Sequence, residues 1–310
     1  MKVLITGANG LLGQHLVKLL LEKNYQVFAT GKGAARFSIS QDQQQYQQHS
    51  YYEMDITDAQ SVARVFAITQ PEVVVHAAAM TQVDDCELNP GQCERTNVQG
   101  TAHVLTEAEI YSRHFIYIST DFVFDGEKGN YSEDDDLKPV SYYGFTKMQA
   151  EALVQTGDMP WSIVRTCLVY GNVLQGTRSN IISWVRDSLQ QGKRIRVVSD
   201  QYRTPTYVED LAKGISLIID RKAEGIFHIS GKDLLTPYDM AVKTAELLQL
   251  DQSLIEKVDA SSFTQPGKRP PRTGFNIEKA RRELGYEPLS FNKGLGRMLN
   301  LNLNKEFEFE

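Results

Sequence analysis

The sequence has few cysteines and no long apolar run. Only three cysteines occur among 310 residues, an odd and low number that speaks against a disulfide framework and favours a reducing cytoplasm. No apolar stretch approaches the roughly 20 residues that a membrane-spanning helix needs. The opening MKVLITGANG is interpreted as a strand and a glycine turn, not as a signal peptide. We therefore expect a cytoplasmic protein with no membrane partner.

The sequence also lacks an excess of positive charge and the spacings of metal sites. It holds 33 Lys and Arg against 39 Asp and Glu, for a net charge of −6, which argues against a nucleic-acid or anionic-membrane binder. The six histidines show no HExxH or comparable spacing, and no G-x-S-x-G nucleophile motif occurs. We expect neither a metal site nor a serine nucleophile of this type.

Short β-branched runs alternate with amphipathic helical segments through the first half of the chain. We expect strands at KVLIT, YQVFAT, EVVVHAAA, HFIYIST and WSIVRT, and helices near residues 10–23, 58–69, 93–110 and 142–155. That order predicts an α/β protein with a Rossmann-type, doubly wound parallel sheet. The alternation then loosens, with helices near 180–191 and 208–219, strands RIRVV and GIFHIS, and a helix that begins at Thr236-Pro237.

This change of pattern predicts a smaller C-terminal α/β lobe that binds the substrate. We assign residues 1–168 to a dinucleotide-binding domain, and residues 169–205 and 225–310 to the substrate-binding lobe. The segment 206–224 is expected to pack back on the first domain. The polar tract 41–49 and the acidic run 133–136 are predicted loops, and the final EFEFE is either an edge strand or a frayed tail.

The first predicted strand runs directly into GANGLLG, where glycines stand three residues apart. Glycines in a strand-to-helix turn let a pyrophosphate approach the amides of the helix N-terminus. The alternative is a tight turn without a ligand. We predict a dinucleotide site here, formed by Gly7, Asn9, Gly10, Leu11, Leu12 and Gly13.

The second predicted strand is followed by GKGAAR, which bears on the choice of cofactor. An acidic residue here usually binds the ribose of NAD, whereas a basic one accommodates the extra phosphate of NADP. Lys32 and Arg36 are present and no acid lies between residues 27 and 41, so NADP(H) is preferred, with NAD(H) as the alternative. We expect the cofactor also to contact Asp55 and Ile56, after a third strand that precedes EVVVHAAA, and Ala77, Ala78 and Ala79, at the end of EVVVHAAA itself.

The stretch SYYGFTK at residues 141–147 places a lysine four residues after a tyrosine. Tyr143 and Lys147 share one face of the predicted helix, and a cation there would lower the pKa of the phenol toward neutrality. Tyr142 has no such partner and is expected to pack or to line the site. The spacing alone arises by chance about once in a chain of this composition, so its meaning depends on other motifs.

Seven motifs in order resemble the extended short-chain dehydrogenase/reductase family. They are GANGLLG, HAAAMTQVDDCE, TNVQGT, YISTDFVFDG, YYGFTKMQAE, VRTCLVYG and SDQYRTPTYVEDLA, with a weaker match at 268–288. Within this family they most resemble the dTDP-4-dehydrorhamnose reductases.

The resemblance implies a catalytic set of Thr120, Tyr143 and Lys147. Thr120 would hydrogen-bond the keto oxygen of the substrate, and Tyr143 would donate a proton to it as hydride arrives from the nicotinamide. Lys147 would bind the nicotinamide ribose and lower the tyrosine pKa. Asn97 would support the cofactor side of the site.

The resemblance also implies a nucleotide-sugar substrate, bound by Thr81, Val83, Thr120, Asp121, Leu168, Arg203 and Arg269. Leu168 stands where the reductases often have tryptophan. Phe122 stands where related dehydratases carry a catalytic acid, which argues against dehydration. The basic residues among the prolines at 268–272 either bind the pyrophosphate or lie in a solvated loop.

We therefore expect an NADPH-dependent reductase of a nucleotide-linked 4-keto-6-deoxysugar, such as dTDP-4-dehydrorhamnose, that acts as a monomer or homodimer. Two alternatives stay open. One is an NAD-dependent sugar-nucleotide epimerase on the same scaffold. The other is a non-catalytic NADP-binding regulatory subunit, because a fold does not fix a function.

Overall fold

A computed structural model describes residues 1–36, 49–174 and 180–301. Within them, seven parallel strands form one sheet in the order β10-β6-β5-β4-β1-β2-β3. This order confirms the predicted Rossmann-type, doubly wound sheet. The strands are β1 (Lys2–Thr6), β2 (Gln26–Gly31), β3 (His49–Glu53), β4 (Val73–His76), β5 (His114–Thr120), β6 (Trp161–Thr166) and β10 (Gly225–His228).

The strands read as apolar runs because both faces of the sheet are buried. Along β1, Val3 and Ile5 point into one core while Leu4 points into the other, as the two-residue period of a strand requires. All three side chains have no solvent exposure. Burial on both faces explains why the residues between Lys2 and Thr6 are all apolar.

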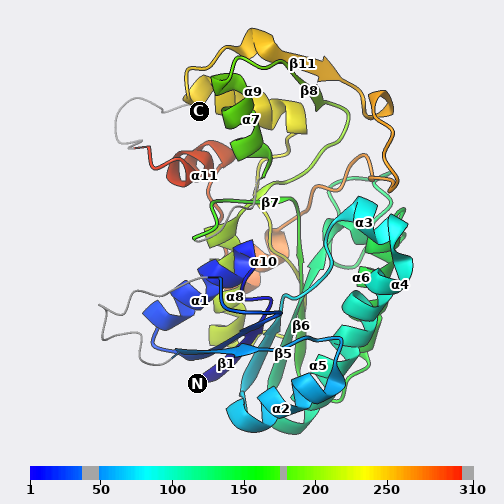
Figure 1. The fold of residues 1–310 in the computed structure, drawn as a ribbon, viewed down its shortest axis with the longest axis vertical. Coiled ribbons are helices and arrows are strands. Elements are labelled where there is room, and N and C mark those ends of the chain that lie inside the picture. The colour runs from blue at the N-terminus through cyan, green and yellow to red at the C-terminus, as the bar shows by residue number, and fades with distance from the viewer. Residues whose placement is uncertain (37–48, 175–179, 302–310) are drawn as a thin grey trace.

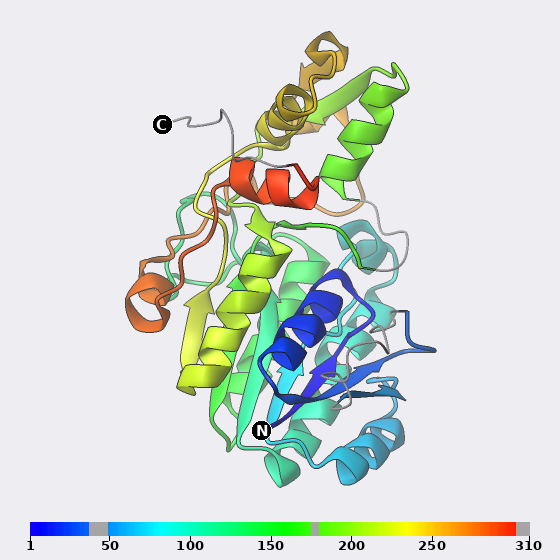
Figure 2. The same ribbon diagram turned by 90° about the vertical axis from the view of Figure 1, so that its left-hand side faces the viewer.

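Helices cover both faces of this sheet, as Figures 1 and 2 show. One face carries α1 (Leu11–Glu22), α8 (Val208–Arg221) and α10 (Glu278–Leu284), whose apolar residues share a core with β1. The opposite face carries α2 (Ala59–Thr69), α5 (Gly100–Tyr111) and α6 (Tyr142–Gln155). The predicted helices near 10–23, 58–69 and 142–155 are thus confirmed.

A smaller lobe lies above the large sheet in Figure 1. It contains a two-stranded parallel sheet of β8 (Ile195–Val198) and β11 (Ile255–Val258), packed against α7 (Ile181–Gln190) and α9 (Pro237–Leu247). A short pair, β7 (Val169–Tyr170) and β9 (Thr206–Tyr207), and α11 (Phe291–Met298) complete the region next to it. The sequence did not predict β11.

The predicted start of α9 at Thr236-Pro237 is confirmed. The Thr236 hydroxyl accepts a hydrogen bond from the Asp239 backbone amide at 3.1 Å, and the Asp239 carboxylate accepts one from the Thr236 amide at 2.9 Å. These two bonds satisfy amides that the first turn of a helix would otherwise leave without partners. Proline at the first helical position loses no hydrogen bond there.

The domain boundaries need one correction. Helix α8 packs against α1 on the large sheet, which agrees with the expectation that residues 206–224 pack back. However, β10 pairs with β6 in the large sheet and α10 packs beside it, although residues 225–310 were assigned to the lobe. The rest of the division stays a prediction.

The acidic run at 133–136 is not a fully solvated loop as predicted. Glu133 is buried, and its carboxylate accepts a hydrogen bond from the His228 amide at 2.9 Å. Burial raises the pKa of this carboxyl. Most of the polar tract 41–49 and all of EFEFE lie outside the described residues.

Candidate functional site

The glycine turn after β1 brings α1 close to the end of β4. Gly7 has a φ of +70°, and a Cβ there would lie 2.9 Å from backbone atoms of Ala77 and Ala78. A Cβ on Gly13 would lie 2.4 Å from the Gly7 carbonyl oxygen. Gly7 therefore requires glycine for its conformation and for close approach, and Gly13 for close approach alone. Gly10 precedes the first residue of α1, and its amide bonds the Gly7 oxygen at 2.9 Å.

Asn9 ties the loop after β2 to this turn. Its Nδ2 donates to the Ala34 carbonyl at 3.1 Å and to the Tyr51 hydroxyl at 2.9 Å. Its Oδ1 accepts from the Arg36 amide at 2.7 Å. The basic loop is thus fixed beside the glycines, where the sequence predicted it.

Lys32 and Asp55, both predicted to contact the cofactor, lie together. Lys32 Nζ is 2.9 Å from Asp55 Oδ2, and the lysine side chain is 81% exposed. Burial alone would raise the pKa of Asp55, but its hydrogen bonds with Lys32 and Thr57 outweigh burial and lower it. The lysine is exposed, so the pair costs little to separate.

Small residues at the end of β4 face the turn. The amides of Ala77 and Ala78 both donate to the Thr6 hydroxyl, at 3.1 and 3.0 Å. Thr6 in turn contacts the ring of His76 at 2.7 Å. These bonds fix the backbone beside Gly7. The other predicted cofactor residues have less open positions: Leu11, Leu12 and Ala79 are half-buried and Ile56 is buried.

Asn97 lies on η2 (Arg95–Gln99), a π-helical turn between α4 (Pro90–Glu94) and α5. Its side chain accepts from the Met80 amide at 2.8 Å and donates to the Met80 carbonyl at 3.0 Å. It also donates to Thr146 Oγ1 on α6 at 3.1 Å. Asn97 therefore holds the segment after β4 against α6, and its support of the cofactor side stays a prediction.

These residues fit a dinucleotide. The turn leaves no side chain between the Gly7 backbone and the first turn of α1, whose free amides favour an anion. The glycines and the small residues after β4 give room for a pyrophosphate and nicotinamide, and the basic loop lies at the β2 end of the same edge.

The three predicted catalytic residues converge at the carboxyl end of β5. Thr120 ends that strand, and α6 brings Tyr143 and Lys147 against it. Ser141 caps α6 by accepting from the Gly144 amide at 3.2 Å. A Cβ on Gly144 would lie 2.1 Å from the Phe122 carbonyl oxygen. Gly144, which the sequence argument did not single out, therefore lets α6 approach the strand end.

Tyr143 is buried, with 8% of its surface exposed. Burial raises its pKa, and a hydrogen bond with Thr120 only partly offsets that effect. The predicted lowering of the Tyr143 pKa by Lys147 is therefore wrong in this structure. The reason is that Lys147 Nζ donates to the Ile118 carbonyl at 2.7 Å and lies over the Tyr117 ring, 4.0 Å from its centroid.

Lys147 is buried and therefore easily deprotonated. Burial lowers its pKa to about 7, against a smaller opposing effect of Glu151. A buried ammonium loses its hydration, so its neutral form is favoured. At neutral pH the lysine lies close to the midpoint between its two protonation states.

An apolar cluster with two thiols surrounds Tyr143. Cys86 and Cys93 are fully buried and pack with Tyr143, together with Phe122. The Phe122 ring meets the Tyr143 ring edge-on, with centroids 5.8 Å apart. Tyr142 lies at the edge of this cluster, and its hydroxyl donates to Glu94 at 3.4 Å. It packs as expected, outside the catalytic set.

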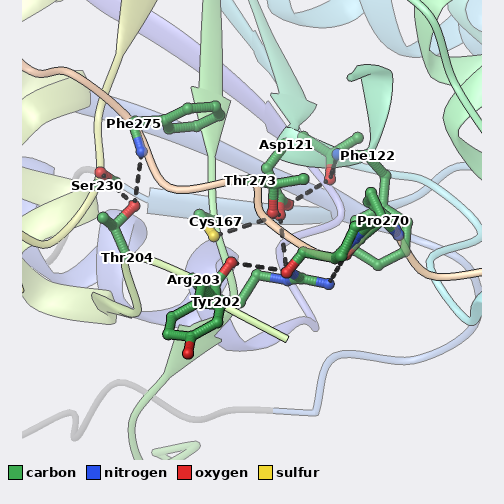
Figure 3. A network of polar contacts seen from close by, with 12 residues as sticks. Asp121, Phe122, Cys167, Tyr202, Arg203, Thr204, Ser230, Pro270, Thr273 and Phe275 are labelled. Carbon is green, nitrogen blue, oxygen red and sulfur yellow. Dashed lines mark hydrogen bonds and ion pairs between the residues drawn. The ribbon is translucent and has the colours of Figure 1, made fainter. Parts of the chain in front are cut away.

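Asp121 joins the strand end to the smaller lobe, as Figure 3 shows. Its carboxylate accepts hydrogen bonds from the Thr120 hydroxyl at 3.2 Å, from the Cys167 thiol at 3.3 Å and from the Thr273 hydroxyl. The same carboxylate lies 3.6 Å from Arg203 Nε. The residue is 2% exposed. A buried carboxylate needs such partners, because an unpaired one is costly.

Arg203 is also buried and bonded within the protein. Its guanidinium donates to the carbonyls of Tyr202 at 2.8 Å and Pro270 at 2.6 Å. Through Asp121 and Pro270 it connects the segment before β9, the strand end and the segment before α10. Its predicted contact with a substrate stays a prediction.

The other predicted substrate residues lie near α3 (Val83–Leu88) and at a strand break. Arg269 forms a bidentate pair with Asp84, with both N–O distances at 2.8 Å. Val83 begins α3 and Thr81 lies exposed before it. Leu168, after β6, has a φ of +37°, a conformation that strains a bulky residue and is often found at functional sites.

One cavity is lined by residues around Arg269, and another lies in the smaller lobe. A cavity of about 330 Å³ is lined by Lys268, Arg269 and Pro270 with Asp125 and Gln201, among others. A larger one, about 640 Å³, lies beside α7 and β8 and contains none of the predicted site residues. We regard the smaller cavity as part of the site because it adjoins the segment that Asp121 and Arg203 hold.

A family model described as the RmlD substrate binding domain matches residues 1–303. The chain belongs to this family. A crystal structure of a dTDP-4-dehydrorhamnose reductase from Clostridium acetobutylicum is 31% identical, with a TM-score of 0.84, and the match covers 97% of this chain and 99% of that one. The resemblance to these reductases that the seven motifs predicted is confirmed.

Two further relatives matter for function. A dTDP-4-dehydrorhamnose reductase from Bacillus anthracis, solved in complex with NADP, is 27% identical, with a TM-score of 0.83 over 97% of this chain and 99% of that one. Methionine adenosyltransferase 2 subunit beta from Bos taurus is 30% identical over 277 residues, 87% of this chain and 78% of the relative. Similar chains thus carry names of both enzymes and subunits.

In residues 1–36, 49–174 and 180–301, no helix has the length and apolar character to cross a membrane. The same residues contain no group of three or more His, Cys, Asp or Glu side chains arranged to hold a metal ion.

The glycine turn generates a stability prediction. Gly7→Ala adds both backbone strain and a clash with the end of β4, whereas Gly33→Ala, at a φ of +73° with no atom within 4 Å of the new Cβ, adds strain alone. We expect the control to cost about 1 kcal/mol and Gly7→Ala distinctly more, measured by urea unfolding. Equal losses would contradict the close packing of the turn.

The buried lysine generates a pH prediction. Its folded pKa of about 7 lies below the unfolded value of 10.5, so between these values only the unfolded chain holds the proton. The unfolding free energy of the wild type, relative to Lys147→Met, should therefore rise as pH increases from 7 to 10.5. Lys193→Met, which removes an exposed lysine, gives the baseline. A flat difference between wild type and Lys147→Met would refute the burial argument.

Proposed function

We propose that the protein is an NADPH-dependent reductase of a nucleotide-linked 4-keto-6-deoxysugar, such as dTDP-4-dehydrorhamnose, which it converts to dTDP-rhamnose. The observation that carries the proposal is the convergence of Thr120, Tyr143 and Lys147 at the end of β5, beside a glycine turn that fits a dinucleotide. Membership of the RmlD substrate binding domain family and the similar dTDP-4-dehydrorhamnose reductases support it.

NADPH, when bound, supplies the hydride for the ketone carbon. Tyr143 then donates its proton to the ketone oxygen as negative charge develops there. Burial raises the pKa of this phenol, which keeps it protonated and ready to act as an acid. A developing alkoxide is more basic than a phenolate, so the transfer stays favourable. Thr120 would hydrogen-bond the same oxygen, and Lys147 would hold the nicotinamide ribose.

The loop after β2 supports a preference for NADP(H) over NAD(H). Lys32 and Arg36 follow that strand, and Lys32 meets Asp55 in an exposed pair. A phosphate on the adenine ribose would attract the lysine away from the carboxylate at little cost. The similar reductase solved with NADP supports the same preference.

The residues around Tyr143 favour reduction over dehydration. A dehydratase needs an acid after Asp121, and Phe122 stands there with its ring against Tyr143. The cluster it forms with Cys86 and Cys93 excludes water from the phenol.

Two other functions also have support. A sugar-nucleotide epimerase uses the same fold, and it would retain tightly bound NAD after purification. A regulatory subunit is suggested by the name of the similar methionine adenosyltransferase 2 subunit beta, and it would bind NADP without oxidising NADPH in the presence of any ketosugar.

Tyr143→Phe removes the proposed proton donor. We expect kcat for NADPH oxidation with dTDP-4-dehydrorhamnose to fall about 10²- to 10⁴-fold, with NADPH affinity retained. Tyr142→Phe, a change at the preceding residue, is the matched control and should retain most of the rate. Undiminished turnover by Tyr143→Phe would sink this mechanism.

Lys32→Ala tests the choice of cofactor. We expect the dissociation constant of NADPH, measured by fluorescence titration, to rise on the order of tenfold, because a hydrogen bond to a charged group is lost. The affinity for NADH should stay unchanged. Lys18→Ala, on the exposed side of α1, serves as the control. An equal change for NADPH and NADH would show that Lys32 does not contact the extra phosphate.

A further inference from the structure

Glu151 is a fully buried carboxylate that the proposed reaction does not use. It lies one helical turn after Lys147 and two turns after Tyr143 on α6, so all three side chains share a face of the helix. Its carboxylate forms a fork with Arg165 on β6, with Nη2–Oε2 at 2.7 Å and Nε–Oε1 at 3.1 Å. The Ser119 hydroxyl on β5 also donates to it.

The side chains on this face of α6 contact three consecutive residues of β5. The Ile118 carbonyl accepts from Lys147 Nζ at 2.7 Å, the next residue, Ser119, donates to Glu151, and Thr120 follows with its hydroxyl toward Tyr143. Glu151 therefore holds the same strand end that carries the proposed reaction.

Two buried cations depend on this carboxylate: Arg165 pairs with it at 2.7 Å, and its charge opposes the lowering of the Lys147 pKa. Tyr117 on β5, Tyr143 on α6 and His76 on β4 are neutral beside the lysine, because burial raises the pKa of both phenols and lowers that of His76 to about 3. Cys93 on α4 has a pKa lowered by its hydrogen bond with Cys86, and as a thiolate it supports the Lys147 charge less than Glu151 does. Arginine does not lose its proton in proteins. Loss of the carboxylate would therefore drive the proton off Lys147 and not off Arg165.

We propose that Glu151 is a positioning residue that keeps Lys147 positively charged and seated on the Ile118 carbonyl. It thereby sets the pH above which the protein loses its hold on the nicotinamide ribose. This inference rests on the proposed function for its kinetic consequence, but the charge on Lys147 can be measured without substrate.

The first test is the pH profile of kcat/KM for NADPH oxidation with dTDP-4-dehydrorhamnose. Glu151→Gln keeps the size of the side chain and removes its charge, and its alkaline limb should move to lower pH by about 1 unit or more. Arg165→Met removes the competing cation, and its limb should move to higher pH. Ser119→Ala, the matched control, breaks one bond to Glu151 without changing a charge and should leave the midpoint of the limb in place.

The second test needs neither substrate nor cofactor. The thermal unfolding temperature is measured against pH for the protein with and without Lys147→Met, and the difference reports the titration of Lys147 in the folded state. When both proteins also carry Glu151→Gln, this titration should move to lower pH. Loss of turnover in every protein, with the titration still shifted, would reject the proposed function and support the inference. Midpoints unchanged by Glu151→Gln and Arg165→Met in both tests would overturn the inference.

Discussion

The close approach of α6 to the carboxyl end of β5 is the contact on which the candidate site depends. Gly144 permits it, because any side chain there would overlap the Phe122 carbonyl. The approach buries Tyr143 and Lys147, and burial decides their protonation: it raises the pKa of the phenol and lowers that of the lysine to about 7. A phenol that stays protonated beside an easily deprotonated lysine follows from this one packing contact.

The same strand end also connects the two parts of the molecule. Asp121 follows Thr120, and its carboxylate binds Thr273 and faces Arg203, which in turn holds the Pro270 carbonyl. A buried carboxylate and guanidinium without partners would each be costly, so the network fixes the geometry of the segments that bring it together. Changes in the lobe are thereby coupled to the position of the Thr120 hydroxyl, which bonds the same carboxylate.

The sequence predicted most of the large sheet, because strands buried on both faces read as apolar runs, and it placed α6 correctly from Tyr142 to Gln155. It missed β11, whose four residues IEKV alternate too briefly to stand out. Motif order brought Thr120 and Tyr143 together, yet the direction of the Tyr143 pKa shift depends on Phe122 and Cys93, which belong to separate elements. The Asp84–Arg269 pair, 185 residues apart in the chain, has no local signal at all.

Hydride transfer from free NADPH to a ketosugar is the central claim, and isotope transfer tests it directly. Purified protein would be incubated with dTDP-4-dehydrorhamnose and NADPH dideuterated at C4 of the nicotinamide, followed by mass spectrometry of the sugar nucleotide. The account predicts one deuterium at the sugar carbon that carried the ketone, with one NADP⁺ formed per product. Sugar that remains unreduced, or a product without deuterium, would contradict it.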